Sequence, residues 1–142
     1  MKLADYVQKR NGTPLGANNS LKNMLIRSLG AGKFSSFWKY WNPIWSYYLG
    51  KYVFKPLKII LPNSLSLILT FVFCGFIHDI VIMIIRERFS LIFTQWFLLM
   101  SLWIVISESM KLDYSKYSWI VRASINVIII GASFTFAYFV RI

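Results

Sequence analysis

Three long apolar segments fill the second half of the chain. They cover residues 64–85, 89–107 and 119–140, and short polar stretches separate them. A helix of about 20 apolar residues crosses the hydrocarbon core of a bilayer, since each residue adds about 1.5 Å. The pattern therefore predicts an all-α membrane protein whose region 63–142 holds about three transmembrane helices. Because only residues 86–88 separate the first two, either the helix ends unwind at the membrane surface or one segment turns back without crossing.

The preceding residues mix polar, basic and aromatic positions, and they predict a region that lies on the membrane. Residues 1–19 are polar and rich in turn formers, so we expect a surface loop after a short N-terminal turn. The basic and aromatic region 20–62 follows. Ser20 can cap a basic amphipathic helix that Gly30 is placed to end. This helix can either pack against the protein or lie among lipid headgroups.

An aromatic segment covers residues 34–57, with three Trp and four Tyr among its lysines. Rings with polar tips suit the interface between membrane and water. Pro43 and Pro56 are expected to interrupt any continuous helix. The segment therefore predicts short amphipathic helices that lie along the membrane or dip into it.

Composition and charge point to the same class. With 57% hydrophobic residues, the chain is too apolar for one small soluble core. The formal net charge is +11, and ten of the sixteen basic residues precede Pro62. Since nucleic-acid binders rarely contain long apolar runs, we expect membrane lipids and no nucleic acid as partners. The positive-inside rule places the N-terminus in the cytoplasm, and we expect the bacterial inner membrane.

Other sequence signals exclude several kinds of chemistry. The lone Cys74 lies in an apolar run, so it forms no intrachain disulfide and no cysteine-based metal site. The first residues lack the apolar core of a cleavable signal peptide. The sequence also has no nucleotide-binding glycine loop and no close carboxylate pair.

Two ionisable residues, His78 and Asp79, lie in the middle of the first apolar segment. Such residues are costly inside a membrane unless they are paired or functional, and both explanations are open here. Consecutive side chains point about 100° apart on a helix, so these two must find different partners. Gly75 has no side chain and leaves space beside His78. This space could admit a substrate or, more commonly, another helix. In the aromatic segment, Asn42 precedes a proline and fits a turn or cap residue.

Two motifs resemble the membrane-bound O-acyltransferase family. Residues 37–42 (FWKYWN) and, ten positions on, residues 52–57 (YVFKPL) are similar to its aromatic FWxxW[HN] motif and the Tyr, hydrophobic and Pro-Leu residues that follow it. Residues 73–78 (FCGFIH) are similar to the family's F-small-G-x-x-His run, which ends in an intramembrane histidine. The resemblance covers about residues 34–85.

The resemblance implies transfer of an acyl group from a thioester, commonly acyl-CoA, to a hydroxyl, with no permanently bound cofactor. His78 matches the catalytic histidine, and a buried, neutral imidazole would accept the hydroxyl proton. Asn42 matches the His/Asn position, where an amide would orient a substrate or donate to the oxyanion. The candidate substrate-binding residues are Trp38, Lys39, Trp41, Tyr52, Gly75 and Asp79.

The number of spans departs from the family pattern, because family members usually have many more. We therefore expect a minimal enzyme completed by self-association, half of a split enzyme, or a degenerate relative kept for structure. The first two cases imply a homo-oligomer or another membrane chain as partner. The alternative to an enzyme is a non-catalytic membrane subunit in which His78 and Asp79 serve helix packing and assembly.

Overall fold

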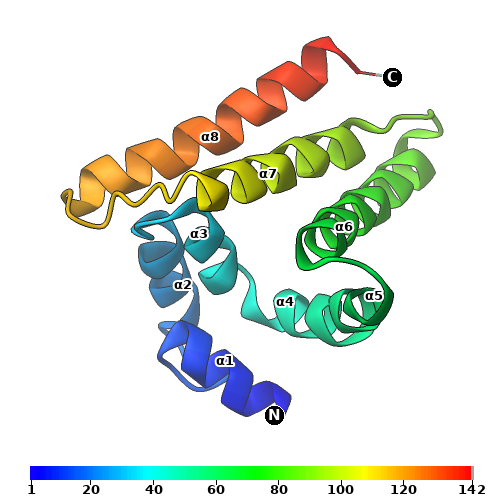
Figure 1. Ribbon diagram of the computed structural model, residues 1–142. Helices are drawn as coiled ribbons and strands as arrows, with labels where there is room; N and C mark the ends of the chain where they lie inside the picture. The colour runs from blue at the N-terminus through cyan, green and yellow to red at the C-terminus, as the bar shows by residue number, and fades with distance from the viewer. Residues whose placement is uncertain (142) are drawn as a thin grey trace.

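The computed structural model describes residues 1–141, whose regular structure is entirely helical (Figure 1). This confirms the all-α prediction. In chain order the elements are α1 (Leu3–Asn11), α2 (Ser20–Leu29), α3 (Phe34–Tyr40), α4 (Pro43–Leu49), the π-helix η1 (Gly50–Phe54), α5 (Lys55–Ile60), α6 (Asn63–Arg86), α7 (Ile92–Ser109) and α8 (Trp119–Phe139).

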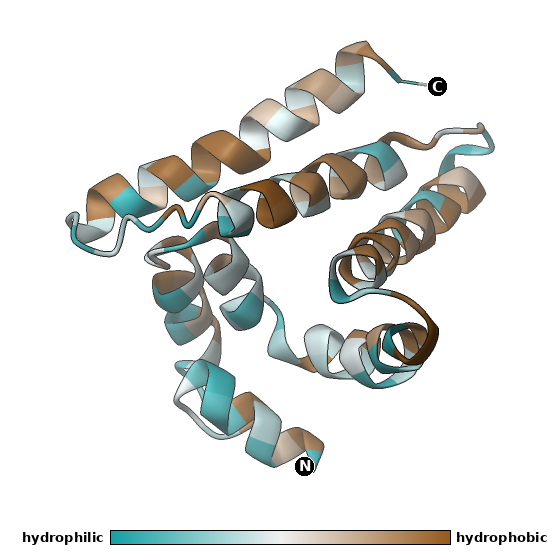
Figure 2. Ribbon diagram, in the orientation of Figure 1, coloured by the Kyte–Doolittle hydropathy of each residue, from teal (hydrophilic) through white to brown (hydrophobic). Residues whose placement is uncertain are grey.

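Helices α6, α7 and α8 are long and apolar enough to cross a membrane, as predicted. Hydrophobic residues dominate all three in Figure 2, while hydrophilic residues gather in α1 and α2. The central helix α7 packs against α6 on one side and α8 on the other (Figure 1). Large apolar side chains such as Ile84 and Ile128 are exposed on the outer helices. A bilayer covers such surfaces at no cost in free energy, so the chain is an integral membrane protein.

The link between the first two spans is longer than the sequence indicated. Helix α6 ends at Arg86 and α7 begins only at Ile92. Glu87 ends α6 in the left-handed conformation, with φ 52°. Of the two alternatives, the structure therefore shows unwinding: the first turn expected of the second span is part of the connection.

The N-terminal segment forms a helix where a loop was expected. Helix α1 buries Val7 and Asn11, and Gly12 ends it with φ 76°. The Asn11 amide donates to the Ser20 carbonyl oxygen (3.0 Å) and hydroxyl (2.9 Å), which joins α1 to the start of α2. The loop prediction was wrong because so small a buried face produces no apolar periodicity.

Helix α2 ends at Gly30 as predicted, but its N-cap is Asn19 and not the predicted Ser20, which is the first helical residue. Only part of its apolar surface packs inward, with Leu29 against the hydrophobic core. Ser28 is buried, while Leu21 is 66% exposed and Leu25 is exposed as well. Of the two predicted settings for this basic amphipathic helix, the exposed leucines favour the lipid headgroup layer.

The aromatic segment folds as expected at Pro43 and differently at Pro56. Pro43 is the first residue of α4, where the missing N–H costs nothing. Pro56 lies inside one helical run from α4 through η1 to α5, so the predicted interruption was wrong. A proline ring clashes with the carbonyl four residues back, here that of Tyr52. Tyr52 belongs to the wider π-helical turn, which accommodates the ring.

A buried amide ties α8 to the N-terminal region. Asn126 Nδ2 donates to the carbonyl oxygens of Leu29 (2.8 Å) and Ala31 (3.0 Å), in the link between α2 and α3. The Tyr114 hydroxyl donates to Asn126 Oδ1 over 2.5 Å. Burial, reinforced by the Asp113 carboxylate, raises the pKa of Tyr114 to about 12, so this donor keeps its proton at neutral pH. These contacts hold α8 against the end of α2 and the residues that follow it.

Candidate active site

A cavity of about 350 Å³, here called the main cavity, lies between the aromatic helices and the membrane spans. Helices α1, α3, α4, α6 and α7 and the π-helix η1 all contribute to its lining. On α6 the lining residues Leu67, Phe71, Cys74 and His78 follow helical spacing and share one face. At 1.5 Å per residue this stripe is about 16 Å long. His78 lies at its C-terminal end.

A second cavity, here called the side cavity, has a volume of about 370 Å³. Its lining includes Ile77, Val81 and Phe93 from the spans. Three residues line both cavities, namely His78, Asn42 and Trp45. The two motifs that were far apart in sequence therefore meet where the two cavities adjoin.

The hydrogen bond of His78 defines its tautomer. Nδ1 lies 2.7 Å from the Cys74 carbonyl oxygen, which can only accept, so Nδ1 carries the proton. In a neutral imidazole, Nε2 then has the lone pair and can accept a proton. The ring also stacks between Phe93 and Phe97, at centroid distances of 5.7 and 5.4 Å. We expected a buried imidazole, but the side chain is exposed, because the part of the ring that Phe93 and Phe97 do not cover faces the two cavities.

Asp79 has a different set of partners, as the helical geometry predicted. Its fully buried carboxylate accepts from Phe93 N (3.0 Å), Thr94 N (2.7 Å) and Thr94 Oγ1 (2.6 Å). These backbone groups belong to the first turn of α7, whose N–H groups lack partners within the helix. Asp79 lines neither cavity. Its role in substrate binding stays a prediction, while its contacts favour a structural role.

Gly75 lies against α7 rather than in a cavity. A Cβ atom here would lie 2.6 Å from the Phe93 carbonyl oxygen and 2.8 Å from Thr94 Cα. The missing side chain thus allows α6 and the start of α7 to approach closely. Of the two explanations that the sequence left open, the structure places a helix beside Gly75.

Asn42 is both a cap and a cavity residue. It adopts the left-handed conformation, with φ 40°, and its Oδ1 accepts from Trp45 N over 3.3 Å at the start of α4. The cap confirms the turn interpretation. Its Nδ2 makes no hydrogen bond within residues 1–141, and the side chain lines both cavities. An amide donor is therefore available beside His78.

Three of the predicted substrate-binding residues line the main cavity, namely Trp38, Lys39 and Trp41. The Trp38 indole Nε1 is buried and has no partner among the residues that the structure describes. Its ring lies 5.9 Å from Phe97, the ring that also stacks on His78. The wall of this cavity therefore contains a buried N–H donor that no described residue satisfies.

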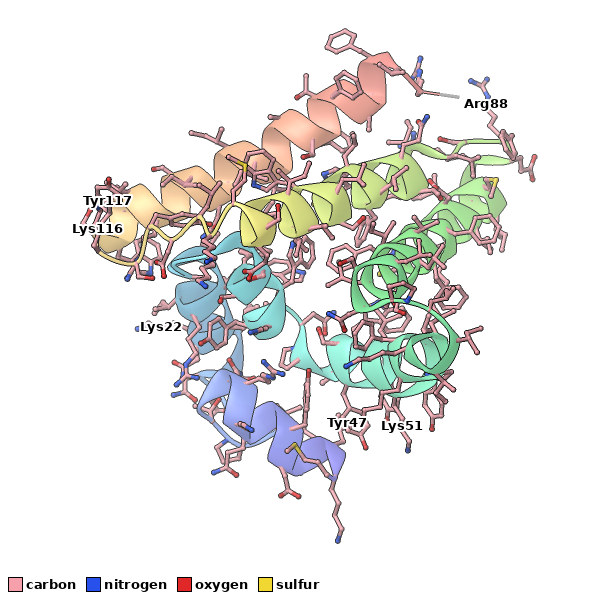
Figure 3. The ribbon with its side chains drawn as sticks, viewed as in Figure 1. Lys22, Tyr47, Lys51, Arg88, Lys116 and Tyr117 are labelled. Carbon is pink, nitrogen blue, oxygen red and sulfur yellow. The ribbon has the colours of Figure 1, made fainter. Side chains whose placement is uncertain are left out.

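Tyr52 is not brought to the site. It is 64% exposed, lines neither cavity and stacks on Tyr48 at 6.2 Å. The neighbouring Lys51 ammonium lies 5.1 Å from its ring centroid, and Figure 3 shows Lys51 on the outside of the molecule. The pKa of Lys51 is raised, chiefly by its contact with Tyr52. Substrate binding by Tyr52 stays a prediction, and its surroundings suit the membrane interface better.

Several residues that line the main cavity were not predicted from the sequence. Cys74, whose Sγ accepts from Trp45 Nε1 over 3.1 Å, could have been found by helical spacing from His78. Tyr6 and Arg10 could not, since they belong to the segment read as a loop. The Arg10 guanidinium lies 5.1 Å from the Tyr6 ring centroid, and its buried Nε has no partner among residues 1–141. Arg10 is a second cationic residue in the lining of the main cavity, in addition to Lys39.

Fold and site together define a helical membrane protein that presents a histidine from a spanning helix to two adjoining cavities. The family described as MBOAT, membrane-bound O-acyltransferase family, matches residues 10–140. The chain belongs to this family, which confirms the resemblance of its motifs. Neither a curated protein nor a solved structure matches the chain.

Proposed function

We propose that the protein transfers an acyl group from a thioester donor, with acyl-CoA the expected donor, to a hydroxyl acceptor, and that His78 is the general base. The observation that carries this proposal is the free Nε2 of His78 at the junction of two cavities. Two reactants could reach such a nitrogen from different sides. Membership of an acyltransferase family supports the class of reaction.

The proposed reaction uses two polar side chains at the junction, His78 and Asn42. Nε2 of His78 accepts the acceptor's hydroxyl proton as the oxygen attacks the thioester carbonyl carbon. The carbonyl becomes an oxyanion, to which Asn42 Nδ2 donates a hydrogen bond. Collapse of this intermediate forms the ester and breaks the carbon–sulfur bond. The leaving thiolate then takes the proton from His78.

The charge of the lining suggests which cavity holds the donor. Arg10 and Lys39 line the main cavity, whereas no lysine or arginine among the described residues lines the side cavity. An acyl-CoA carries phosphates, which cations bind. The main cavity therefore takes the donor and the side cavity the hydroxyl acceptor.

The decisive test replaces His78 with Gln, which keeps an amide donor for the Cys74 carbonyl but cannot accept a proton at neutral pH. General-base catalysis contributes about 10²–10⁴-fold, so turnover of acyl-CoA should fall by that factor. His78→Ala should act likewise. Abundance in the membrane and elution on size exclusion should match wild type for both variants. Normal acyl transfer by correctly assembled His78→Gln protein would falsify the catalytic assignment.

The competing function, a non-catalytic membrane subunit, rests on Asp79, whose carboxylate is used in helix packing. His78 supports it only through the stacking of its ring on Phe93 and Phe97 of α7, because its hydrogen bond goes to its own helix rather than to a neighbour. If His78 serves only packing, its substitution should reduce assembly and function in the same proportion. The two functions thus predict opposite results for the same His78 variants.

We also propose a setting for the enzyme. The working unit contains more than one chain, either copies of this one or another membrane chain. The N-terminus faces the cytoplasm, which suits a soluble acyl thioester, and the membrane is the bacterial inner membrane. The assembly rests on the exposed site and the orientation on the charge distribution, and these two proposals are tested below.

A further inference from the structure

One face of the run formed by α4 and η1 contributes a continuous part of the main cavity's wall. Ser46, Leu49, Gly50 and Phe54 line it, at the spacing of one helical face. Large side chains at Leu49 and Phe54 therefore flank a position with no side chain. Gly50 leaves a gap between these two apolar side chains.

The backbone does not require glycine at this position. Gly50 has φ −62° and ψ −43°, values that every residue adopts in a right-handed helix. Glycine inside a helix costs about 0.5–1 kcal/mol relative to alanine. A Cβ atom added at Gly50 would meet no atom within 4 Å, so no neighbour excludes a side chain either. What glycine provides at Gly50 is open space beside the main cavity.

The local helix type marks the same position. Gly50 begins η1, and π-helical turns occur frequently at functional sites. The turn packs against α6, the helix that carries the lining stripe from Leu67 to His78. The gap therefore belongs to the compartment that ends at the candidate base.

From these observations we propose that Gly50 determines how long an acyl chain the main cavity accepts. The inference rests on the proposed function, in which this cavity holds the acyl-CoA. The apolar wall around Gly50 contacts the chain, while Arg10 and Lys39 hold the anionic part. A larger side chain at Gly50 would fill the gap and shorten the space for the chain.

The test measures binding rather than transfer, so it does not depend on the unidentified acceptor. Acetyl-, octanoyl- and palmitoyl-CoA are bound to the purified full chain in nanodiscs, and empty nanodiscs correct for partition into lipid. The variants are Gly50→Ala, Gly50→Val and Gly50→Leu. Filling a hydrophobic pocket by one or more carbon groups discriminates about 10–200-fold, so Gly50→Leu should weaken palmitoyl-CoA binding by that factor. Acetyl-CoA should bind as to wild type, with the smaller substitutions in between.

Gly131 provides the matched control. It also lies in a helix, α8, and a Cβ atom there also meets nothing within 4 Å, but it lines neither cavity. Gly131→Leu should leave all three affinities unchanged. Unchanged acetyl-CoA binding by Gly50→Leu shows that this variant is folded.

Two results would overturn the inference. If Gly50→Leu binds every chain length like wild type, the gap does not receive the chain, while the proposed function stands. If wild type binds none of the three thioesters above the level of empty nanodiscs, the proposed donor is wrong and the inference falls with it.

Discussion

At the scale of single residues, the chemistry depends on which nitrogen of His78 carries the proton. The Cys74 carbonyl, one turn earlier on the same helix, fixes the proton on Nδ1. Because both groups belong to α6, this tautomer does not depend on how the helices pack. The stacking of Phe93 and Phe97 then limits the ring's orientation. A base held in this way needs no carboxylate partner, which leaves Asp79 free for another role.

Asn42 combines two functions that one substitution can separate. Asn42→Asp keeps an oxygen that accepts from Trp45 N, and Asp tolerates the positive φ, but it lacks the Nδ2 donors. Loss of an oxyanion donor costs about 10²–10³-fold in turnover. We expect that loss in Asn42→Asp with normal yield, whereas Asn42→Ala should also lower the yield. Turnover per mole of monodisperse protein is the measurement, and wild-type turnover in Asn42→Asp would leave Asn42 as a cap only.

Sequence could predict the two motif residues but only part of the site around them. The motifs placed His78 and Asn42 in chemical roles, and the structure brings both to the junction of the cavities. Arg10 could not be predicted, because its place in the cavity lining depends on how α1 packs. A nine-residue helix with two buried positions shows no periodic pattern of apolar residues in the sequence. The opposite error concerned Tyr52, which belongs to a motif yet faces away from both cavities. A motif identifies residue types, whereas the direction in which a side chain points depends on the helix that carries it. For Tyr52 that helix is the π-helix η1.

At the scale of elements, the junction of α6 and α7 holds the site in place. Gly75 allows the close approach, and Asp79 satisfies the first N–H groups of α7. Sequence located both spans to within a few residues but missed the start of α7, because apolar residues continue before Ile92. Hydropathy shows which residues lipid can surround, whereas the position of a helix end depends on its capping groups. For α7 the capping group is the Asp79 carboxylate, which belongs to another helix, α6.

We predict that Asp79→Asn destabilises the protein rather than changing substrate affinity. An amide has one oxygen where the carboxylate uses two, so at least one N–H of the first turn of α7 loses its acceptor. Leaving a buried donor unpaired costs about 1–3 kcal/mol. Thermal unfolding in a fixed detergent should show this loss, and Thr94→Val, which removes only the hydroxyl donor, should show a smaller one. Normal stability with a raised KM for acyl-CoA would instead support substrate binding by Asp79.

At the scale of the whole molecule, basic residues separate to the two ends of the spans. Figure 3 shows Lys116 at one end of α7 and α8 and Arg88 at the other. The ten basic residues before Pro62 outnumber those of the Arg88 end, and cytoplasmic loops retain such charges. We therefore expect cysteines at Lys9 and Lys116, in a Cys74→Ser background, to react with an impermeant maleimide only after the cells are permeabilised. A cysteine at Arg88 should react in intact cells, and the reverse pattern would invert the topology.

The exposed imidazole also bears on how many chains form the working unit. His78 projects from a spanning helix into the side cavity, whose rim includes Val81, 50% exposed. Polar groups at membrane depth are costly when they face lipid, so a neighbouring chain that closes the side cavity would stabilise the protein. We therefore predict an assembly of at least two chains, measured as mass in nanodiscs.

Two bulky substitutions test where the neighbouring chain packs. Val81→Trp at the rim of the side cavity should reduce the assembled fraction and acyl transfer together, because the larger side chain obstructs a partner. Ile128→Trp is the matched control: Ile128 is 65% exposed on α8 and lines neither cavity, so its substitution should change neither quantity. Tryptophan is tolerated in a lipid-facing position, so both variants should insert normally. A strictly monomeric species with full activity would end the oligomer prediction, and it would require lipid itself to close the side cavity over His78.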